Sequence, residues 1–211
     1  MLKPSSRVLR LGDIHFQLLT KFNLIFIGKF TVNQETSTIN LNKTAEFYLS
    51  QGKLEAAYEI CQNILGDLPN FAPAYNTQGK VLQAMGKIES AIISYRQAIK
   101  LNPQQIETYK ILGDILVKQE QLSEAIACYE TAIKYNPKAS LFHHKLGLVL
   151  IQLKNWDEAV SAFCRSIQFN PNFPWSYYKL GEALTAQKKW HQAVIAYQRS
   201  IEIKPDLYWS Y

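Results

Sequence analysis

Small and apolar residues recur along residues 38–207 in two helical stripes that alternate with polar stretches. When this segment is divided into units of 34 residues, positions 4, 7, 8 and 11 of each unit form one stripe, and positions 20, 24, 27 and 28 form the next. Residues spaced three and four apart lie on one face of an α-helix. Each unit is therefore predicted to form two amphipathic helices joined by a short polar turn, which makes the predicted fold all-α.

Proline sets the period of this pattern. A proline ends a helix because it lacks the backbone N–H and because its ring clashes with the preceding turn. Five prolines stand 34 residues apart, at position 32 of every unit: Pro69, Pro103, Pro137, Pro171 and Pro205. The predicted repeats are 38–71, 72–105, 106–139, 140–173 and 174–207. Neither helix of a unit can bury its apolar stripe alone, so neighbouring units are predicted to stack.

Small residues mark the predicted contact between the two helices of a unit. Position 20 is alanine in all five units, and position 8 is Ala45 in the first unit and glycine in the other four. Position 24 is Cys61 in the first unit and an aromatic residue in the others. Small residues let two helix backbones approach closely, and aromatic rings fill the space beside them. Between the helices, Gly52 and Gly86 are predicted to be the C-cap glycines of the first two turns.

The residues at positions 8, 20, 24 and 32 resemble, in register, the signature of the tetratricopeptide repeat. The resemblance covers residues 38–207 and implies a right-handed superhelical solenoid of antiparallel helix pairs. The first copy departs most from the pattern, at Thr44, Ala45, Cys61 and Ile64. A terminal repeat is expected to be atypical because one of its faces has no neighbour. Family members hold peptides or partner helices in a concave groove, so the resemblance implies a non-catalytic protein–protein interaction scaffold or adaptor.

The resemblance also indicates which residues face that groove, namely positions 2, 5, 6, 9 and 12 of each first helix. The candidate partner-binding residues among them are Asn76, Lys80, Lys110, Asp114, His144, Lys145, Trp175, Tyr178, Lys179 and Glu182. Toward its C-terminal half the row becomes basic and aromatic, which favours an acidic or aromatic-containing protein or peptide ligand. In this interpretation Lys110 is paired with Asp114. The alternative is that Lys145 and Lys179 are only solvated and that Trp175 packs against the next unit.

Composition narrows the classes of function. The chain has 211 residues, 47% of them hydrophobic, which is enough for a substantial core. Of the net charge of +6, residues 1–37 contribute +3, with five basic and two acidic residues. The repeats are charge-mixed and lack a dense basic stripe, so nucleic acid is not an expected partner. The three cysteines, Cys61, Cys128 and Cys164, are scattered, which argues against a disulfide framework and favours a cytoplasmic location.

No group of residues indicates catalysis, a metal or a cofactor. The sequence contains no phosphate-binding glycine loop, zinc-protease motif or nucleophile elbow, so we predict no catalytic residue. His143 and His144 are adjacent in a predicted helix, where their side chains diverge by about 100° and cannot chelate one metal ion. His143 instead takes an aromatic core position. Trp156 and Trp190 both stand at position 17 and are predicted to belong to the core.

The two ends do not complete the repeat pattern. Residues 1–37 form a basic and apolar leader, which is expected to be poorly ordered or to fold over the first repeat. Contact of residues 1–30 with a membrane surface is a less favoured interpretation. Residues 208–211 begin a truncated sixth repeat, which favours a fragment of a longer array. Two rival functions therefore stay open: an N-terminal or internal arm of a larger enzyme, such as a glycosyltransferase or other transferase, and a membrane-surface adaptor.

Overall fold

The computed structural model describes residues 36–205, in which the regular structure is helical. It falls into two compact units, residues 1–69 and 70–211, which are described separately below. The predictions for residues 1–35 and for the start of a sixth repeat at 208–211 lie outside the described residues. Within the described part there is no β-strand, and no helix is long and apolar enough to cross a membrane. The predicted all-α class is confirmed.

The described part of the first unit is one helical hairpin. A helix that covers residues 36–50 is followed by a turn and by α2, Leu54–Asp67. Ala45, Ala57 and Cys61, at positions 8, 20 and 24, are completely buried where the two helices meet. Burial, with a smaller contribution from a nearby glutamate, raises the pKa of Cys61 to about 12. Cys61 is therefore a neutral core residue, as predicted from its position.

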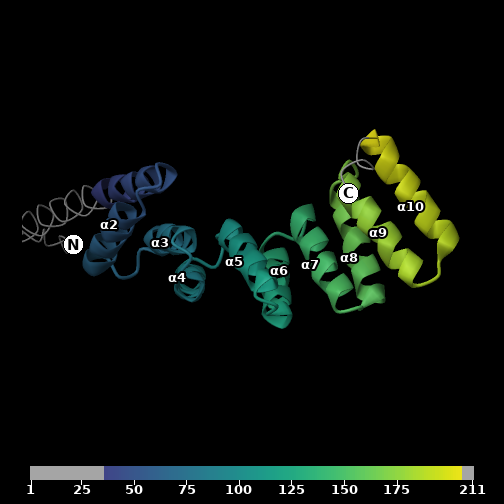
Figure 1. The fold of residues 1–211 in the computed structure, drawn as a ribbon, viewed down its shortest axis with the longest axis horizontal. Coiled ribbons are helices and arrows are strands. Elements are labelled where there is room, and N and C mark those ends of the chain that lie inside the picture. The colour runs from purple at the N-terminus through teal and green to yellow at the C-terminus, as the bar shows by residue number, and fades with distance from the viewer. Residues whose placement is uncertain (1–35, 206–211) are drawn as a thin grey trace, which may run out of the picture. The chain divides into compact units, whose positions relative to one another are not determined.

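Residues 70–205 form four consecutive helical hairpins (Figure 1). The helices are α3 (Ala72–Ala84), α4 (Ile88–Leu101), α5 (Ile106–Lys118), α6 (Leu122–Tyr135), α7 (Ser140–Gln152), α8 (Trp156–Phe169), α9 (Pro174–Ala186) and α10 (Trp190–Ile203). Each first helix packs against the second helix of its own hairpin and, from α5 onward, against the second helix of the preceding hairpin. The hairpins thus stack in sequence order, which confirms the predicted helical-repeat solenoid.

Position 8 is where the two helices of a hairpin approach most closely. In each hairpin the glycine lies against the ring at position 24: Gly79 on Tyr95, Gly113 on Tyr129, Gly147 on Phe163 and Gly181 on Tyr197. A Cβ atom added to Gly147 would lie 2.7 Å from Phe163, closer than real Cβ contacts come. Glycine is therefore needed where position 24 carries a ring. In the first unit, Cys61 replaces the ring and position 8 is Ala45.

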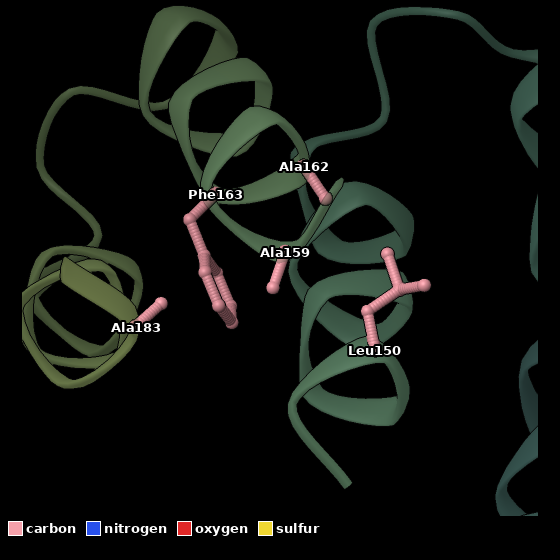
Figure 2. Close-up of a cluster of buried hydrophobic side chains, with 5 residues drawn as sticks. All are labelled: Leu150, Ala159, Ala162, Phe163 and Ala183. Atoms are coloured by element: carbon pink, nitrogen blue, oxygen red, sulfur yellow. The ribbon is translucent and has the colours of Figure 1, made fainter. Parts of the chain in front are cut away.

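A buried cluster from three consecutive helices joins two neighbouring hairpins. Figure 2 shows its side chains converging: Leu150 of α7, Ala159, Ala162 and Phe163 of α8, and Ala183 of α9. Ala159, Phe163 and Ala183 are completely buried. Because alanine adds almost no bulk, α8 can approach both α7 and α9, and the Phe163 ring fills the remaining space. The cluster explains why position 20 is alanine in every unit.

A residue with left-handed backbone conformation follows each first helix. Gly52 and Gly86 have φ angles of +72° and +75°, which confirms them as the predicted C-cap glycines. The next three hairpins place Glu120, Lys154 and Lys188 at the same position, with φ angles of 58°, 57° and 61°. For a residue other than glycine, this conformation is less stable by about 1–2 kcal/mol. The last three turns therefore carry strain that glycine would relieve.

The two tryptophans at position 17 differ in burial. Trp156 is partly buried and packs against the cluster of Figure 2, in agreement with the sequence prediction. Trp190 is 58% exposed, so the prediction that it belongs to the core is wrong. The reason is its place in the stack. Trp156 packs against a cluster that includes Ala183 of α9, whereas α10 is the last helix of the described residues.

Candidate partner-binding surface

An ion pair links the first helices α5 and α7. Lys145 Nζ on α7 lies 2.7 Å and 2.9 Å from the two carboxylate oxygens of Asp114 on α5. Tyr129 of α6 donates its hydroxyl hydrogen to the same carboxylate over 2.7 Å. Burial and then this hydrogen bond raise the pKa of Tyr129, which keeps the phenol protonated and able to donate. Asp114 thereby connects three helices from two hairpins.

This arrangement corrects one sequence interpretation. Lys110 does not pair with Asp114, because its ammonium group contacts Glu107, one turn earlier in α5. Asp114 pairs instead with Lys145, which lies 31 residues later in the chain. Stacking brings position 6 of one hairpin beside position 9 of the hairpin before it. The Lys145 side chain is only 21% exposed, so it is held by its neighbour rather than freely solvated.

A second group of charged and aromatic side chains lies on α9. Lys179 Nζ is 2.8 Å from Glu182 Oε2 and 5.5 Å from the centre of the Tyr178 ring. The Tyr178 ring in turn packs against Tyr197 of α10, with the ring centres 5.6 Å apart. An ammonium group above an aromatic face is attracted by the ring electrons. These contacts fix the direction of Lys179, while the side chains of Lys179 and Glu182 stay 29% and 40% exposed.

His144 belongs to α7 but is buried between that helix and its neighbours, with 8% of its surface exposed. Its ring centre lies 5.6 Å from that of Phe163 and 4.8 Å from that of Phe173, which meets it edge-on. Its Nδ1 atom is 3.0 Å from Ser176 Oγ on α9. Burial, and then repulsion from two nearby lysines, lowers the pKa of His144 to about 4. The ring is therefore neutral near pH 7.

The hydrogen bonds around His144 determine which ring nitrogen carries its hydrogen. Ser166 Oγ is 2.9 Å from the carbonyl oxygen of Ser140, and since a carbonyl only accepts, the Ser166 hydroxyl donates to it. Ser176 Oγ lies 2.8 Å from Ser166 Oγ, so the Ser176 hydroxyl must donate to Ser166. Ser176 is then left to accept from His144, whose hydrogen lies on Nδ1. The chain runs in one direction, from the imidazole to the backbone of Ser140.

The other candidates occupy different parts of the first helices. Asn76 of α3 is 6% exposed, and its Oδ1 atom has no hydrogen-bond partner among the described residues. Lys80 of α3 and Lys110 of α5 are partly buried. Trp175, near the start of α9, is partly buried, and the ammonium group of Lys204 lies 5.6 Å from its ring centre. Trp175 and Lys204 extend the basic and aromatic surface of α9.

Sequence reasoning missed the serines at positions 3 and 27, Ser176 and Ser166. The pattern marks position 27 only as small, which says nothing about hydrogen bonding. A signal was nevertheless present in the repetition, because position 27 is also serine in the last hairpin. There Ser200 donates to the carbonyl oxygen of Pro174 over 2.9 Å, as Ser166 does to that of Ser140. Serine at this position ties the second helix to the start of the first.

Two pockets open between successive second helices. One, of about 380 Å³, lies between α6 and α8, and its lining includes Glu130 and Glu158. The other, of about 390 Å³, lies between α8 and α10 and is mostly apolar, with Cys164, Leu180 and Ile195 in its wall. The two pockets occupy equivalent places in consecutive hairpins but differ in chemistry. Neither pocket was predicted from the sequence.

His143 fills a core position, as predicted. It is 9% exposed, its ring centre lies 5.4 Å from that of Phe169, and its Nε2 atom is 2.9 Å from the carbonyl oxygen of Pro137. Because the carbonyl can only accept, Nε2 carries the ring hydrogen. Between residues 36 and 205, no group of three or more His, Cys, Asp and Glu side chains is arranged to hold a metal ion.

Family models identify the repeat. Two models described as tetratricopeptide repeat match residues 72–105 and 175–206, and one described as TPR repeat matches residues 113–154 and 147–187. Together these matches cover more than half of the chain. The chain belongs to the tetratricopeptide repeat family. No curated protein sequence matches it.

Solved structures of other proteins share the tetratricopeptide fold seen here. YrrB, described as a TPR protein with an unusual peptide-binding site, superposes with a TM-score of 0.69 and 23% identity over 80% of this chain and 87% of YrrB. MamA from Desulfovibrio magneticus gives 0.70 and 16% identity over 81% of this chain and 96% of MamA. PilF from Pseudomonas aeruginosa gives 0.66 and 22% identity over 80% and 77% of the two chains. At these identities the similarity establishes the fold.

Proposed function

We propose that this tetratricopeptide chain is a non-catalytic scaffold that binds a segment of a partner protein along α5, α7 and α9. The observation that carries the proposal is the row of charged and aromatic side chains on these first helices. Asp114 with Lys145, and Lys179 with Tyr178, are held in fixed positions by contacts within and between hairpins. Side chains that are already ordered lose less conformational entropy when a ligand binds. The peptide-binding site named for YrrB supports a peptide ligand for this fold.

The chemistry of the row favours a segment with acidic and aromatic residues. A lysine ammonium group has three N–H donors. Lys179 uses one donor for Glu182 and remains partly exposed, so a carboxylate of the partner can take another. The rings of Trp175 and Tyr178 lie on the same helix, and aromatic residues contribute strongly at protein interfaces.

The non-catalytic part of the proposal rests on the direction of one hydrogen bond. Ser176 and His144 are 3.0 Å apart, a distance typical of a nucleophile and its base. A catalytic base must accept the serine hydrogen. Here His144 donates through Nδ1, and Ser176 gives its own hydrogen to Ser166. The arrangement suits a structural link between hairpins, not activation of a nucleophile.

Selection of binding peptides tests the proposal. A phage-displayed library of random peptides, panned on the full chain, should enrich sequences that combine acidic and aromatic residues. Binding of an enriched peptide, measured by fluorescence polarisation, should weaken about tenfold or more in Lys179→Glu and in Trp175→Ala. Lys134→Glu is the matched control, because Lys134 is exposed on the second helix α6. Failure to enrich any consensus, or equal weakening by the control, contradicts the proposal.

A further inference from the structure

The outer face of α10 is a chemical copy of an interface that the solenoid forms internally. Four equivalent positions carry the same or similar residues on α8 and α10: Trp156 and Trp190, Ala159 and Ala193, Val160 and Val194, Phe163 and Tyr197. On α8, Val160 is partly buried and packs against the cluster formed by Leu184 of α9 with Ala193 and Ala196 of α10. On α10, Val194 is 52% exposed and Trp190 is 58% exposed. The α10 face is thus the second-helix half of a stacking interface, without its first-helix half in the described residues.

The complementary half is exposed on the helix at residues 36–50. Positions 7 and 10 of a first helix pack toward the preceding hairpin. On α9 they are Leu180 and Ala183, which lie with the buried cluster around Phe163 of α8. On the helix at residues 36–50 the same positions are Thr44, which is exposed, and Phe47, which is 59% exposed. This face is therefore the first-helix half of the same interface, again uncovered within the described residues.

We propose that the chain associates head to tail with a second copy of itself, through the α10 face of one copy and the face of helix 36–50 of the next. The occupant follows from continuity with the interface already present between α4 and α5, α6 and α7, and α8 and α9. Each of these contacts joins a second helix to the first helix of the following hairpin. A second copy supplies that first helix in the same register. This association is independent of the partner-binding row on α5, α7 and α9.

The two halves lie on different faces of one chain, so the interface is heterologous. Binding through it leaves one free half at each end of the assembly, and growth is open-ended. Each copy carries a net charge of +6, which opposes association when little salt is present. The interface itself is mainly apolar. Raising the salt concentration is therefore expected to increase the average mass of the assemblies.

Analytical ultracentrifugation with two blocked variants tests the proposal. The wild-type chain should show a weight-average mass that rises with concentration above the monomer mass of 24.2 kDa. Val194→Glu blocks the α10 face and Phe47→Glu blocks the other face, so each variant alone should remain monomeric. An equimolar mixture should form dimers and nothing larger, because each variant retains the half that the other has lost. General stickiness of exposed apolar residues cannot produce this complementation.

Two controls make the outcome decisive. Ile93→Glu removes an apolar residue of α4 that is 67% exposed but lies outside both faces, and it should associate like the wild type. Circular dichroism must show unchanged helix content in every variant, and Thr44→Arg replaces Phe47→Glu should the latter lose helix. A wild-type chain that stays monomeric at every concentration and salt level overturns the proposal. The proposal is also overturned if the equimolar mixture of the two blocked variants stays monomeric, or if Ile93→Glu fails to associate.

Discussion

Acid should destabilise the folded chain through His144, and replacing this one residue should remove that sensitivity. His144 is buried beside two aromatic rings, and its folded-state pKa of about 4 lies below its ordinary value of 6.5. Between these two pH values the unfolded chain binds a proton that the folded chain does not. The free energy of unfolding must therefore fall as the pH falls through this window. The stability is fully present above the unfolded value and is lost toward the folded one.

The size of the effect follows from the two pKa values. The difference between 6.5 and about 4 corresponds to about 3 kcal/mol of folding free energy. About 2 kcal/mol of this should be lost between about pH 7 and about pH 4.5. His144→Asn is the informative variant, because the asparagine amide can still donate toward Ser176 but does not titrate. The variant should start less stable, since it leaves part of the space between Phe163 and Phe173 unfilled.

Urea unfolding followed by far-ultraviolet circular dichroism measures the difference. We expect the wild type to lose about 2 kcal/mol more than His144→Asn when both are taken from about pH 7 to about pH 4.5. Comparing the two proteins cancels the carboxylates, which protonate in both. His191→Asn is the matched control, because His191 is exposed on α10 and lies outside this cluster. Equal losses in the wild type and in His144→Asn would refute the reasoning.

Three further experiments probe the packing of the solenoid. Gly147→Ala should lower the free energy of unfolding by about 1–3 kcal/mol, because the new Cβ clashes with the ring of Phe163. In urea unfolding, adding Phe163→Leu should recover part of this loss. No recovery would show that the loss does not come from the clash. Lys154→Gly should raise the thermal midpoint and add about 1 kcal/mol, since it removes left-handed strain; a lower midpoint would contradict this. Asp114→Asn and Lys145→Gln should each lower the free energy of unfolding. The double variant should lose about 1 kcal/mol less than the sum of the two single losses. Strict additivity would show that the ion pair does not stabilise the fold.

The fold could be predicted because its determinants are local and repeated. Helix ends follow from proline and glycine, which act on the backbone within a few residues. The pairing of a small residue at position 8 with a ring at position 24 is also short in sequence, only 16 residues apart. Position 8 is glycine where position 24 carries a ring, as in Gly147 with Phe163. It is alanine where the ring is absent, as in Ala45 with Cys61. Because the same pattern occurs in five units, each unit independently supports the prediction of a helical hairpin.

The candidate site was predicted less well because its contacts cross between hairpins. Lys110 and Asp114 are four residues apart on one helix, which suggested an ion pair. In the stacked hairpins, Asp114 pairs with Lys145 of the next hairpin instead. Position 17 predicted a core residue for Trp190, although burial depends on whether another helix follows. The role of His144 depends on Ser176, 32 residues later. A periodic pattern identifies which positions are apolar or small, but it does not contain the direction of a hydrogen bond.

The same side chains therefore serve stacking and, in our proposal, recognition. Lys145 joins α7 to α5 through Asp114, and its ammonium group is mostly covered in doing so. A partner carboxylate that reached Lys145 would compete with Asp114, whereas one that reached Lys179 would compete only with Glu182 on the same helix. Disrupting the first pair loosens two hairpins, and disrupting the second leaves the stack intact. Ligand contacts on α9 should therefore destabilise the solenoid less than contacts on α7, and for this reason we propose Lys179, with Tyr178 and Trp175, as the main anchor of the groove.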